Sequence, residues 1–246
     1  MGKVIAVASG KGGTGKTTTV AAVSSCLAAL GHRTLCVDFD CEMKNLDLSI
    51  CMSDFAVTDY MDIVNKQLDL MESCHESPKI PGLFFLGAPT AHTPDWSDAE
   101  AIKEMFDEIR GEFAYCLIDS PSGIGTGFRL AHSVADMSII VTHGELPAVR
   151  DAQLAASAAR DMGVDDIRLL VNRLLRKNFA YMQGTIDDMI DTVCARLLGV
   201  VPEDNSVFMA LHDNTPLVLY KKRHSIYEFL DVSRRIAGEE VPLRLR

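Results

Sequence analysis

The chain has 246 residues, of which 48% are hydrophobic and 24% charged, and its formal net charge is −10 at pH 7. This composition is typical of a soluble globular protein, and the length suits one α/β domain with a large core. The acidic balance argues against a protein that coats nucleic acid or an anionic membrane, because neutralising phosphates requires a basic surface. The longest uncharged stretch, residues 17–32, is too polar and too short to span a bilayer.

The cysteines and the N-terminus both predict a cytoplasmic protein. Seven cysteines cannot all pair, and no two of them have C-x-x-C spacing. The chain passes from Met-Gly-Lys directly into an apolar run, without the features of a signal peptide. We therefore expect a reduced chain that stays in the cytoplasm.

Short apolar runs alternate with helical patterns along the chain. The apolar runs predict strands at residues 4–8, 34–37, 83–86, 115–118, 138–141, 167–171 and 197–201. Helical spacing predicts helices at residues 16–30, 97–110, 147–162, 185–193 and 225–237. Capping boxes that begin at Ser97 and Thr185 mark the start of two of these helices. The alternation predicts a doubly wound α/β fold, with a mostly parallel sheet and helices on both faces.

No internal boundary divides the chain. It contains no repeat of about 20–50 residues, no low-complexity segment and no Ser/Gly/Pro-rich linker. Residues 72–96 carry four prolines and form the most irregular stretch, which we expect to be a surface connection around one strand. We therefore predict a single domain over residues 1–246.

A phosphate-binding loop follows the first predicted strand and opens the first helix. Residues 9–18 read S-G-K-G-G-T-G-K-T-T, which fits the P-loop pattern G-x-x-x-x-G-K-[ST]. Glycines let backbone N–H groups converge on phosphates, a lysine neutralises the β/γ oxygens, and a hydroxyl after it reaches Mg²⁺. The predicted nucleotide-binding residues of the loop are Gly10, Lys11, Gly12, Gly13, Thr14, Gly15, Lys16, Thr17 and Thr18, with Thr17 also on the metal.

Three carboxylates follow predicted strands. Asp38 and Asp40 end the second strand, and Asp119 ends the strand at 115–118. Ligands of doubly wound folds bind at this edge of the sheet, and a P-loop enzyme needs a carboxylate there to hold the Mg²⁺ hydration shell. A single such carboxylate is more often a helix cap or a surface charge. Three of them beside a P-loop favour metal and water roles.

The loop sequence K-G-G-T-G-K-T-T, with Lys11 early and Lys16 late, resembles the deviant P-loop ATPases of the MinD/ParA family. The resemblance implies that Lys11 reaches the nucleotide of a second subunit in an ATP-dependent sandwich dimer. It would act there as an arginine finger does, as a cation supplied in trans to the transferring phosphoryl group. Without the family, Lys11 could equally be a solvated loop lysine.

Two further segments resemble the switch regions of the MinD branch of this family. Residues 38–48 resemble switch I, with Lys44 where the family has Arg, and residues 119–124, D-S-P-S-G-I, resemble switch II, D-S-P-A-G-I. By this resemblance Asp40 orients the attacking water and Asp38 lies close to the phosphates and metal. Asp119 binds Mg²⁺ through water, and the Gly123 N–H meets the γ-phosphate.

The resemblance continues to about residue 243. Residues 144–152 resemble N-P-E-x-x-x-V-R-D-A, with His143-Gly144 replacing Asn-Pro. Asn172 and Arg173 match the pair that frames adenine, with Asn172 reading the edge of the base. Pro202 and Glu203 lie in a V-P-E-D turn that resembles the family's I-P-E-D beside the same base. The preference for ATP over GTP rests on this resemblance.

The family resemblance implies a switch that dimerises with ATP, hydrolyses it to ADP and phosphate, and acts in bacterial division-site selection. Its implied partners are a second copy of the chain, a MinC-like inhibitor and a MinE- or DivIVA-like positioning system. In the family an amphipathic membrane helix follows G-E-x-V-P, which residues 238–242 match. Residues 243–246 are too few for such a helix. We expect either a variant without that helix or a chain that stops short of it, with membrane binding only where the tail exists.

Three alternatives on the same fold stay open, of which a small-molecule ATP-dependent ligase has no substrate-pocket signature in the sequence. A ParA-like partition ATPase would bind DNA, and basic clusters at residues 221–224 and 234–235 could serve it. The net charge of −10 favours solvated surface for these clusters, so nucleic acid is not an expected partner. A cofactor-maturation or metal-carrier ATPase would need cysteines near switch II, and none occurs between Leu117 and Val193.

Overall fold

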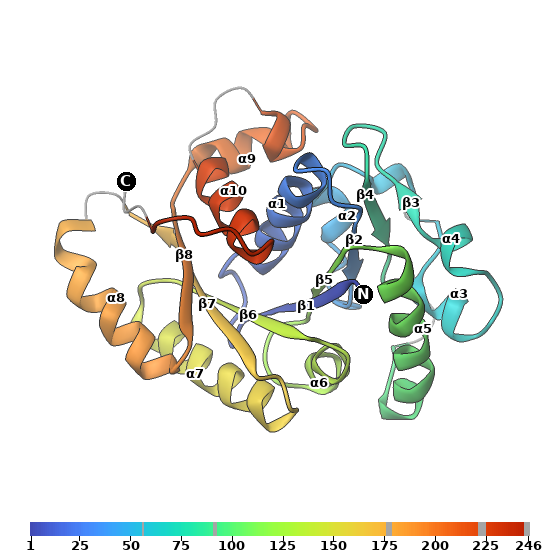
Figure 1. Ribbon diagram of the computed structural model, residues 1–246, viewed down its shortest axis with the longest axis horizontal. Coiled ribbons are helices and arrows are strands. Elements are labelled where there is room, and N and C mark those ends of the chain that lie inside the picture. Colours follow the sequence, from blue (N-terminus) through green and yellow to red (C-terminus); the bar gives the residue numbers. More distant parts are fainter. Residues whose placement is uncertain (56, 91–92, 176–178, 221–224, 244–246) are drawn as a thin grey trace.

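In the part of the chain that the structure describes, the strands form one sheet of eight, in the order β3-β4-β2-β5-β1-β6-β7-β8 (Figure 1). The computed structural model describes residues 1–55, 57–90, 93–175, 179–220 and 225–243, without the side chains of residues 179–185. Among these described residues, every strand pair is parallel except the edge pair β3·β4. The strands are β1 Lys3–Ala8, β2 Thr34–Asp38, β3 His75–Glu76, β4 Leu83–Leu86, β5 Tyr115–Asp119, β6 Met137–Thr142, β7 Asp166–Leu174 and β8 Arg196–Pro202. The α/β fold and the seven predicted strands are confirmed, and β3 was not predicted.

Helices cover both faces of the sheet. They are α1 Lys16–Ala29, α2 Leu46–Ser49, α3 Tyr60–Val64, α4 Leu70–Ser73, α5 Ala99–Glu112, α6 Thr126–Ser133, α7 Leu146–Asp161, α8 Phe179–Val193, α9 Asn205–His212 and α10 Ser225–Ile236. Short 3₁₀ turns lie at η1 Ser53–Phe55, η2 Trp96–Asp98 and η4 Leu217–Leu219. In Figure 1, α1, α9 and α10 lie above the sheet, α5, α6 and α7 lie below it, and α8 lies at its left, beside β8. The five predicted helices all occur, but the shorter ones were not predicted.

Two predicted helix starts are wrong. The capping box before α5 lies two residues earlier than expected, because the Asp95 carboxylate accepts from the Ser97 N–H at 2.7 Å and the Asp98 carboxylate accepts from the Asp95 N–H at 2.9 Å. Helix α8 begins at Phe179, so Thr185 lies inside it rather than at its start. The apolar spacing of the sequence continues upstream through Gly184, and one glycine costs a helix only about 1 kcal/mol.

The core consists of apolar side chains on the two faces of the sheet. On one face α1 and α10 pack over strand residues such as Ile5 and Leu117, with Phe229 fully buried between them. On the other face α5 packs Phe106 over β2, β4 and β5, and α7 and α8 cover β6, β7 and β8. Strands buried on both faces explain the continuous apolar runs of the sequence.

The order of the central strands brings the predicted site residues together. Strand β5 lies between β1 and β2, and its last residue, Asp119, is in register with Val7 of β1 and Asp38 of β2. The phosphate loop follows β1 directly. Parallel strands end at the same edge of the sheet, so the loop and both carboxylates meet there.

One buried histidine predicts how stability depends on pH. The His132 Nδ1–H donates to the Phe128 carbonyl at 2.8 Å, and Nε2 accepts from the Ser138 hydroxyl at 2.9 Å. Burial lowers the pKa of His132 to about 4. The folded state therefore favours the neutral ring, and its stabilisation is complete above pH 6.5 and is lost as the pH falls toward 4.

We expect the His132 contribution to the free energy of unfolding to fall by about 3 kcal/mol between pH 7 and pH 4. Urea unfolding of the wild type and of His132→Gln at several pH values measures it. The variant should lose this part of the pH dependence, whereas His212→Gln, at an exposed histidine, should keep it. Equal pH dependence in wild type and His132→Gln would contradict the assignment.

Candidate nucleotide-binding site

The phosphate loop connects β1 to α1 through two tight contacts that need glycine. Gly15 has a φ of +93°, and a Cβ there would lie 2.2 Å from the Asn172 Nδ2 atom. A Cβ on Gly10 would lie 2.2 Å from the Asp151 carbonyl oxygen in α7. Gly13 also has a positive φ, of +80°. The loop therefore presses against β7 on one side and α7 on the other, which fixes its backbone N–H groups.

The side chains of Lys16 and Thr17 in the loop lie against switch II, residues 119–124. Lys16 is 7% exposed, and its Nζ donates to the Ser122 Oγ at 2.9 Å. The Thr17 hydroxyl lies close enough to the Asp119 carboxylate to lower its pKa. Within the described part of the chain, the Asp119 Oδ1 and the Thr14 hydroxyl are buried without a hydrogen-bond partner. Buried polar atoms without partners are costly, so these two atoms mark a place where a ligand fits.

The two buried carboxylates of the site favour a cation. Burial, together with the negative charge of Asp119, raises the pKa of Asp38 to about 7. Burial raises the pKa of Asp119 to about 6, against the lowering effects of Thr17 and Lys16. Asp38 accepts from the backbone N–H of Asp40 at 2.9 Å and of Leu46 at 3.3 Å, which holds switch I at the strand end. A divalent cation beside these groups would stabilise their ionised forms.

Asp40 and Lys11 lie at the rim of the site. Asp40 is half-buried, and its Oδ1 accepts from the N–H groups of Glu42 at 3.2 Å and Met43 at 3.0 Å. Lys11 is exposed, and its carbonyl accepts from the Ser9 hydroxyl at 2.7 Å. These positions leave both charged groups accessible to a molecule that covers the loop.

A cleft of about 440 Å³ lies beside the loop, between α1, β8 and α9. Nine of the predicted nucleotide-binding residues line it: Gly13, Gly15, Lys16, Thr17, Thr18, Asn172, Arg173, Pro202 and Glu203. The other predicted site residues, Gly10, Lys11, Gly12, Thr14, Asp38, Asp40, Asp119 and Gly123, lie outside its lining, around the loop and the strand ends. Its lining extends from the phosphate loop to β7 and the turn after β8, the part that we call the base end.

The base end of the cleft is built from β7 and the turn after β8. The Asn172 Nδ2 donates to the Thr14 carbonyl at 2.9 Å, and Arg173 donates to the Gly13 carbonyl at 3.0 Å. Arg173 also pairs with the exposed carboxylate of Glu203 at 2.9 Å. These bonds fasten the far wall of the cleft to the loop itself.

The apolar wall of this cleft was not predicted from the sequence. It consists of side chains from β8, α9 and α10, namely Val201, Val207, Phe208, Leu211 and Phe229. The available signal was the V-P-E-D turn followed by the short helix α9, whose Asp204 cap accepts from the Ser206 N–H at 2.9 Å. A flat apolar wall opposite polar groups suits a purine ring.

Comparisons with known proteins agree with this geometry. A family model described as an AAA domain matches residues 2–160. The septum site-determining protein MinD of Bacillus subtilis is 36% identical over 251 residues, which cover 100% of this chain and 92% of the relative. The chain belongs to the MinD family of septum site-determining proteins. The MinD of Escherichia coli K12 is 31% identical, over 99% of this chain and 94% of its own length.

Solved structures of the MinD family have the same architecture. A chain of the MinC:MinD cell division complex of Aquifex aeolicus matches with a TM-score of 0.89 at 29% identity, covering 98% of both chains. A plasmid partition protein of Borrelia burgdorferi matches with a TM-score of 0.77 at 17% identity, which shows a shared fold alone. A MinD-type protein is therefore favoured over a partition ATPase.

The structure also locates His143-Gly144, which departs from the MinD pattern, and one of the two basic clusters that could have served DNA binding. His143 and Gly144, in place of the family's Asn-Pro, line an open cavity of about 490 Å³ that shares Arg173 and Glu203 with the cleft. The basic cluster at 221–224 lies outside the described residues. Arg234 and Arg235 are engaged within the fold, with Glu239 and with the carbonyls of Leu198, Val241 and Pro242 respectively.

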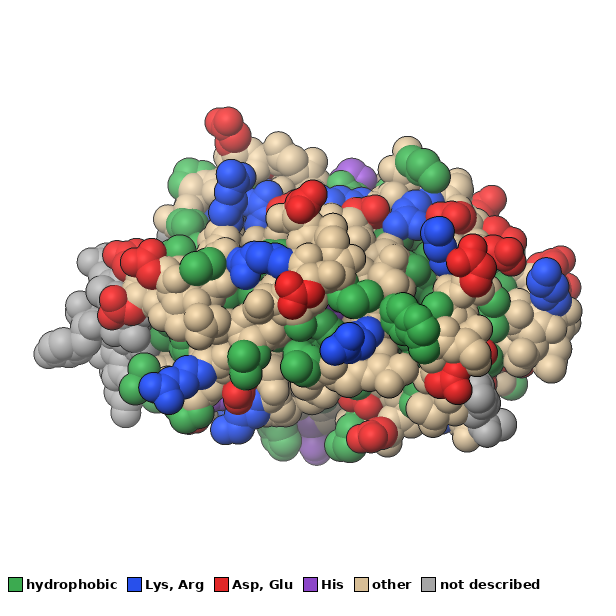
Figure 2. Space-filling view, turned by 90° about the horizontal axis from the view of Figure 1, so that it is seen from below, with side chains coloured by type: hydrophobic (Ala, Val, Ile, Leu, Met, Phe, Trp, Pro, Cys, Tyr) green, Lys and Arg blue, Asp and Glu red, His purple; other side chains and the backbone are tan. Residues whose placement is uncertain are grey.

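Charge is mixed over the face of the molecule covered by α5 to α8. Figure 2 shows acidic and basic side chains interspersed there with single apolar ones, rather than one basic field. Such a surface gives little attraction to a polyanion. Among the described residues, we find no helix of the length and apolarity needed to cross a membrane.

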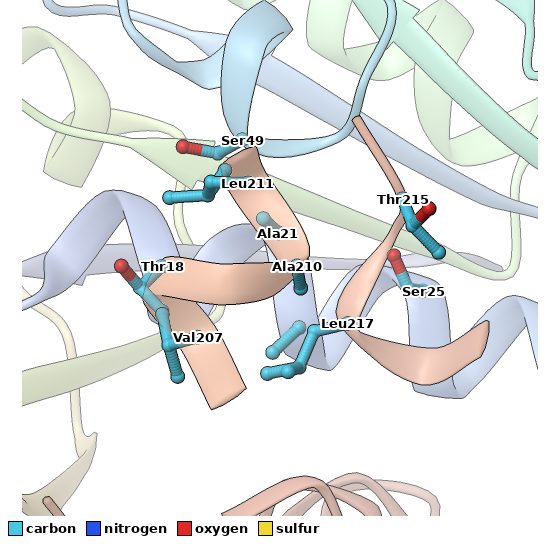
Figure 3. Close-up of a pocket in the computed structure, with 10 residues that line it drawn as sticks. Thr18, Ala21, Ser25, Ser49, Val207, Ala210, Leu211, Thr215 and Leu217 are labelled. Carbon is cyan, nitrogen blue, oxygen red and sulfur yellow. The ribbon is translucent and has the colours of Figure 1, made fainter. Parts of the chain in front are cut away.

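A small pocket lies next to the cleft and shares Thr18, Ser49, Val207 and Leu211 with it. Figure 3 shows how α1 contributes Thr18, Ala21 and Ser25, α9 contributes Val207, Ala210 and Leu211, and the segment after α9 contributes Thr215 and Leu217. Its volume of about 20 Å³ accommodates little more than a water molecule. The pocket therefore belongs to the back wall of the nucleotide cleft in this MinD-family fold.

We expect Gly15→Ala to destabilise the protein by about 2–4 kcal/mol, because it adds a clash with Asn172 to the cost of a left-handed backbone. Gly31→Ala is the matched control, since Gly31 has a φ of +90° but open space around its Cβ position, and it should cost about 1–2 kcal/mol. Urea unfolding measures both. Equal losses in the two variants would mean that the contact with Asn172 is unimportant.

Proposed function

We propose that this protein is a Mg²⁺-dependent ATPase switch of the MinD type, which binds ATP in the cleft, forms a homodimer around it and acts in bacterial division-site selection. The observation that carries the proposal is the meeting of Lys16, Thr17 and Asp119, with the unpartnered Asp119 Oδ1 beside them, at the ends of the central strands. The MinD relatives match the chain over its whole length, which supports the division role.

Each part of the site has a role in this proposal. Backbone N–H groups of residues 10–16 and the N-terminus of α1 bind the phosphates, and Lys16 supplies the positive charge. Thr17 and Asp119 would hold the Mg²⁺, which neutralises charge on the β- and γ-phosphates when bound. Asp38 stays close to that pair and keeps switch I in place through its bonds to the N–H groups of Asp40 and Leu46.

Hydrolysis requires a water held opposite the leaving group, in line with the γ-phosphorus, and a cation that stabilises the charge on the transferring phosphoryl group. We assign the water to Asp40, whose carboxylate lies at the rim with switch I. We assign the additional cation to Lys11 of the second subunit, because Lys11 is exposed at the outer edge of the loop. The Gly123 N–H completes the donors on the γ-phosphate side.

Adenine is assigned to the base end of the cleft. Asn172 lies there with Arg173, Pro202 and Glu203, opposite the apolar side chains of α9. The Asn172 Nδ2 is held by the Thr14 carbonyl, which leaves its oxygen to accept from an exocyclic amine such as that of adenine. This arrangement supports ATP over GTP.

The partners proposed are those of a MinD cycle. The related Aquifex chain was solved as a MinC:MinD cell division complex, which supports a MinC-like inhibitor as partner. We extend the proposal to a MinE- or DivIVA-like positioning system and to action in the bacterial cytoplasm. Switching follows if ATP binds the dimer more tightly than the monomer, because hydrolysis then returns the population to monomers.

Nucleotide titration tests the proposed activity directly. A fluorescent ATP analogue should bind with Mg²⁺ and be displaced by ATP and ADP much more readily than by GTP. Phosphate release from ATP should stop when EDTA removes the metal. Absence of ATP binding, or phosphate release that is indifferent to EDTA, would contradict the proposal.

A further inference from the structure

Switch II, residues 119–124, is fastened to the phosphate loop by two hydrogen bonds. The Lys16 Nζ donates to the Ser122 Oγ at 2.9 Å, and the Gly123 N–H donates to the Ser9 carbonyl at 3.1 Å. Neighbouring residues of switch II therefore hold both ends of the loop, since Ser9 precedes it and Lys16 ends it. Gly123 reaches its position with a φ of +84°, which glycine tolerates without strain.

The bond to Lys16 is the stronger of the two because its donor is charged. Within the described part of the chain, no carboxylate lies within ion-pair distance of Lys16, so the Ser122 hydroxyl is the side-chain partner of a nearly buried ammonium. Charge-assisted hydrogen bonds are shorter and stronger than neutral ones. Ser122 itself is exposed, so water can take the place of Lys16 as the partner of its hydroxyl when the lysine turns to another acceptor.

Ser122 is also where switch II departs from the pattern it resembles. The chain reads D-S-P-S-G-I at residues 119–124, against D-S-P-A-G-I, and an alanine could not accept a hydrogen bond from Lys16. Both donors of these two bonds, the Lys16 Nζ and the Gly123 N–H, are the groups assigned to phosphate oxygens in the proposed function. The Ser122 hydroxyl and the Ser9 carbonyl therefore accept hydrogen bonds from the two donors that a bound triphosphate needs.

We propose that Ser122 is a positioning residue that holds switch II against the phosphate loop and competes with the phosphates of ATP for Lys16. This inference rests on the proposed function. Binding of ATP must break the bond between Lys16 and Ser122, and switch II is then released from the loop together with the Gly123 N–H. The strength of the bond sets how far ATP binding and the movement of switch II are coupled.

The affinity for ATP tests this proposal. We expect Ser122→Ala to bind a non-hydrolysable ATP analogue about fivefold more tightly than the wild type, equivalent to about 1 kcal/mol for the lost competing bond. Ser122→Thr keeps a hydroxyl and should bind within about twofold of the wild type. Thr126→Ala, at another exposed hydroxyl four residues along, is the matched control and should leave the affinity unchanged. Thermal unfolding confirms that each variant is folded.

A second readout follows switch II itself. Without nucleotide, the Gly123 amide hydrogen should exchange faster in Ser122→Ala than in the wild type, because the neighbouring bond no longer holds the segment. Exchange and affinity equal to those of the wild type would overturn the proposal. Weaker binding by Ser122→Ala would also overturn it, because the hydroxyl would then contact the bound phosphate. If the wild type itself binds no ATP, the proposed function fails and this inference fails with it.

Discussion

Lys16→Ala is expected to lower the affinity for ATP about a hundredfold, the largest effect of any single side chain in the site. Lys16 is nearly buried and lies in a cradle that already contains Asp38 and Asp119. Without the ammonium, triphosphate would enter next to two acidic groups with no cation from the loop. One or more charge-assisted hydrogen bonds to phosphate, each worth about 1.5–3 kcal/mol, would be lost as well.

Titration with a fluorescent ATP analogue measures this change. Lys103→Ala is the control, because Lys103 is an exposed lysine of α5 on the opposite side of the sheet, and it should bind as the wild type does. The unfolding temperature of Lys16→Ala should remain close to that of the wild type, so that loss of binding is separated from loss of fold. Retained affinity in Lys16→Ala would show that phosphates bind elsewhere.

Asp40→Asn is expected to slow ATP hydrolysis about a hundredfold while ATP still binds, which is the typical effect of removing a group that orients the attacking water. The substitution is mild, because the amide oxygen of asparagine can still accept from the N–H groups of Glu42 and Met43. The charge is removed while the turn is kept.

Single-turnover phosphate release, together with the dissociation constant for ATP, separates hydrolysis from binding. Asp54→Asn, at an exposed carboxylate in η1 and outside switch I, is the matched control and should hydrolyse ATP at the wild-type rate. A wild-type rate in Asp40→Asn would remove Asp40 from the mechanism. A parallel loss of ATP binding would assign it to nucleotide binding instead.

The sequence alone was sufficient to predict that the carboxylates at two strand ends meet the phosphate loop. Asp38 and Asp119 each end an apolar run, and parallel strands place their ends at one edge, so their meeting with the loop follows from the fold class. The glycine pattern of residues 10–15 likewise required a strand before it and a helix after it, and both occur. Local pattern and topology agree here, which is why the prediction holds.

Other features depend on contacts between distant segments and could not be predicted. The bond between Lys16 and Ser122 joins residues 106 positions apart, and whether a serine hydroxyl reaches a lysine depends on side-chain geometry rather than on spacing. The apolar wall contributed by α9 depends on how a short helix packs after β8. Helix α8 began earlier than expected because its apolar spacing outweighed one glycine.

The central claim is that ATP joins two copies of this chain around the nucleotide and that hydrolysis separates them. The most direct measurement is the molar mass of the Asp40→Ala variant by size exclusion with light scattering, in Mg²⁺ with ATP and with ADP. We predict twice the monomer mass with ATP and the monomer mass, 26.9 kDa, with ADP. Monomers in both nucleotides, from a variant that is shown to bind ATP, would contradict the account.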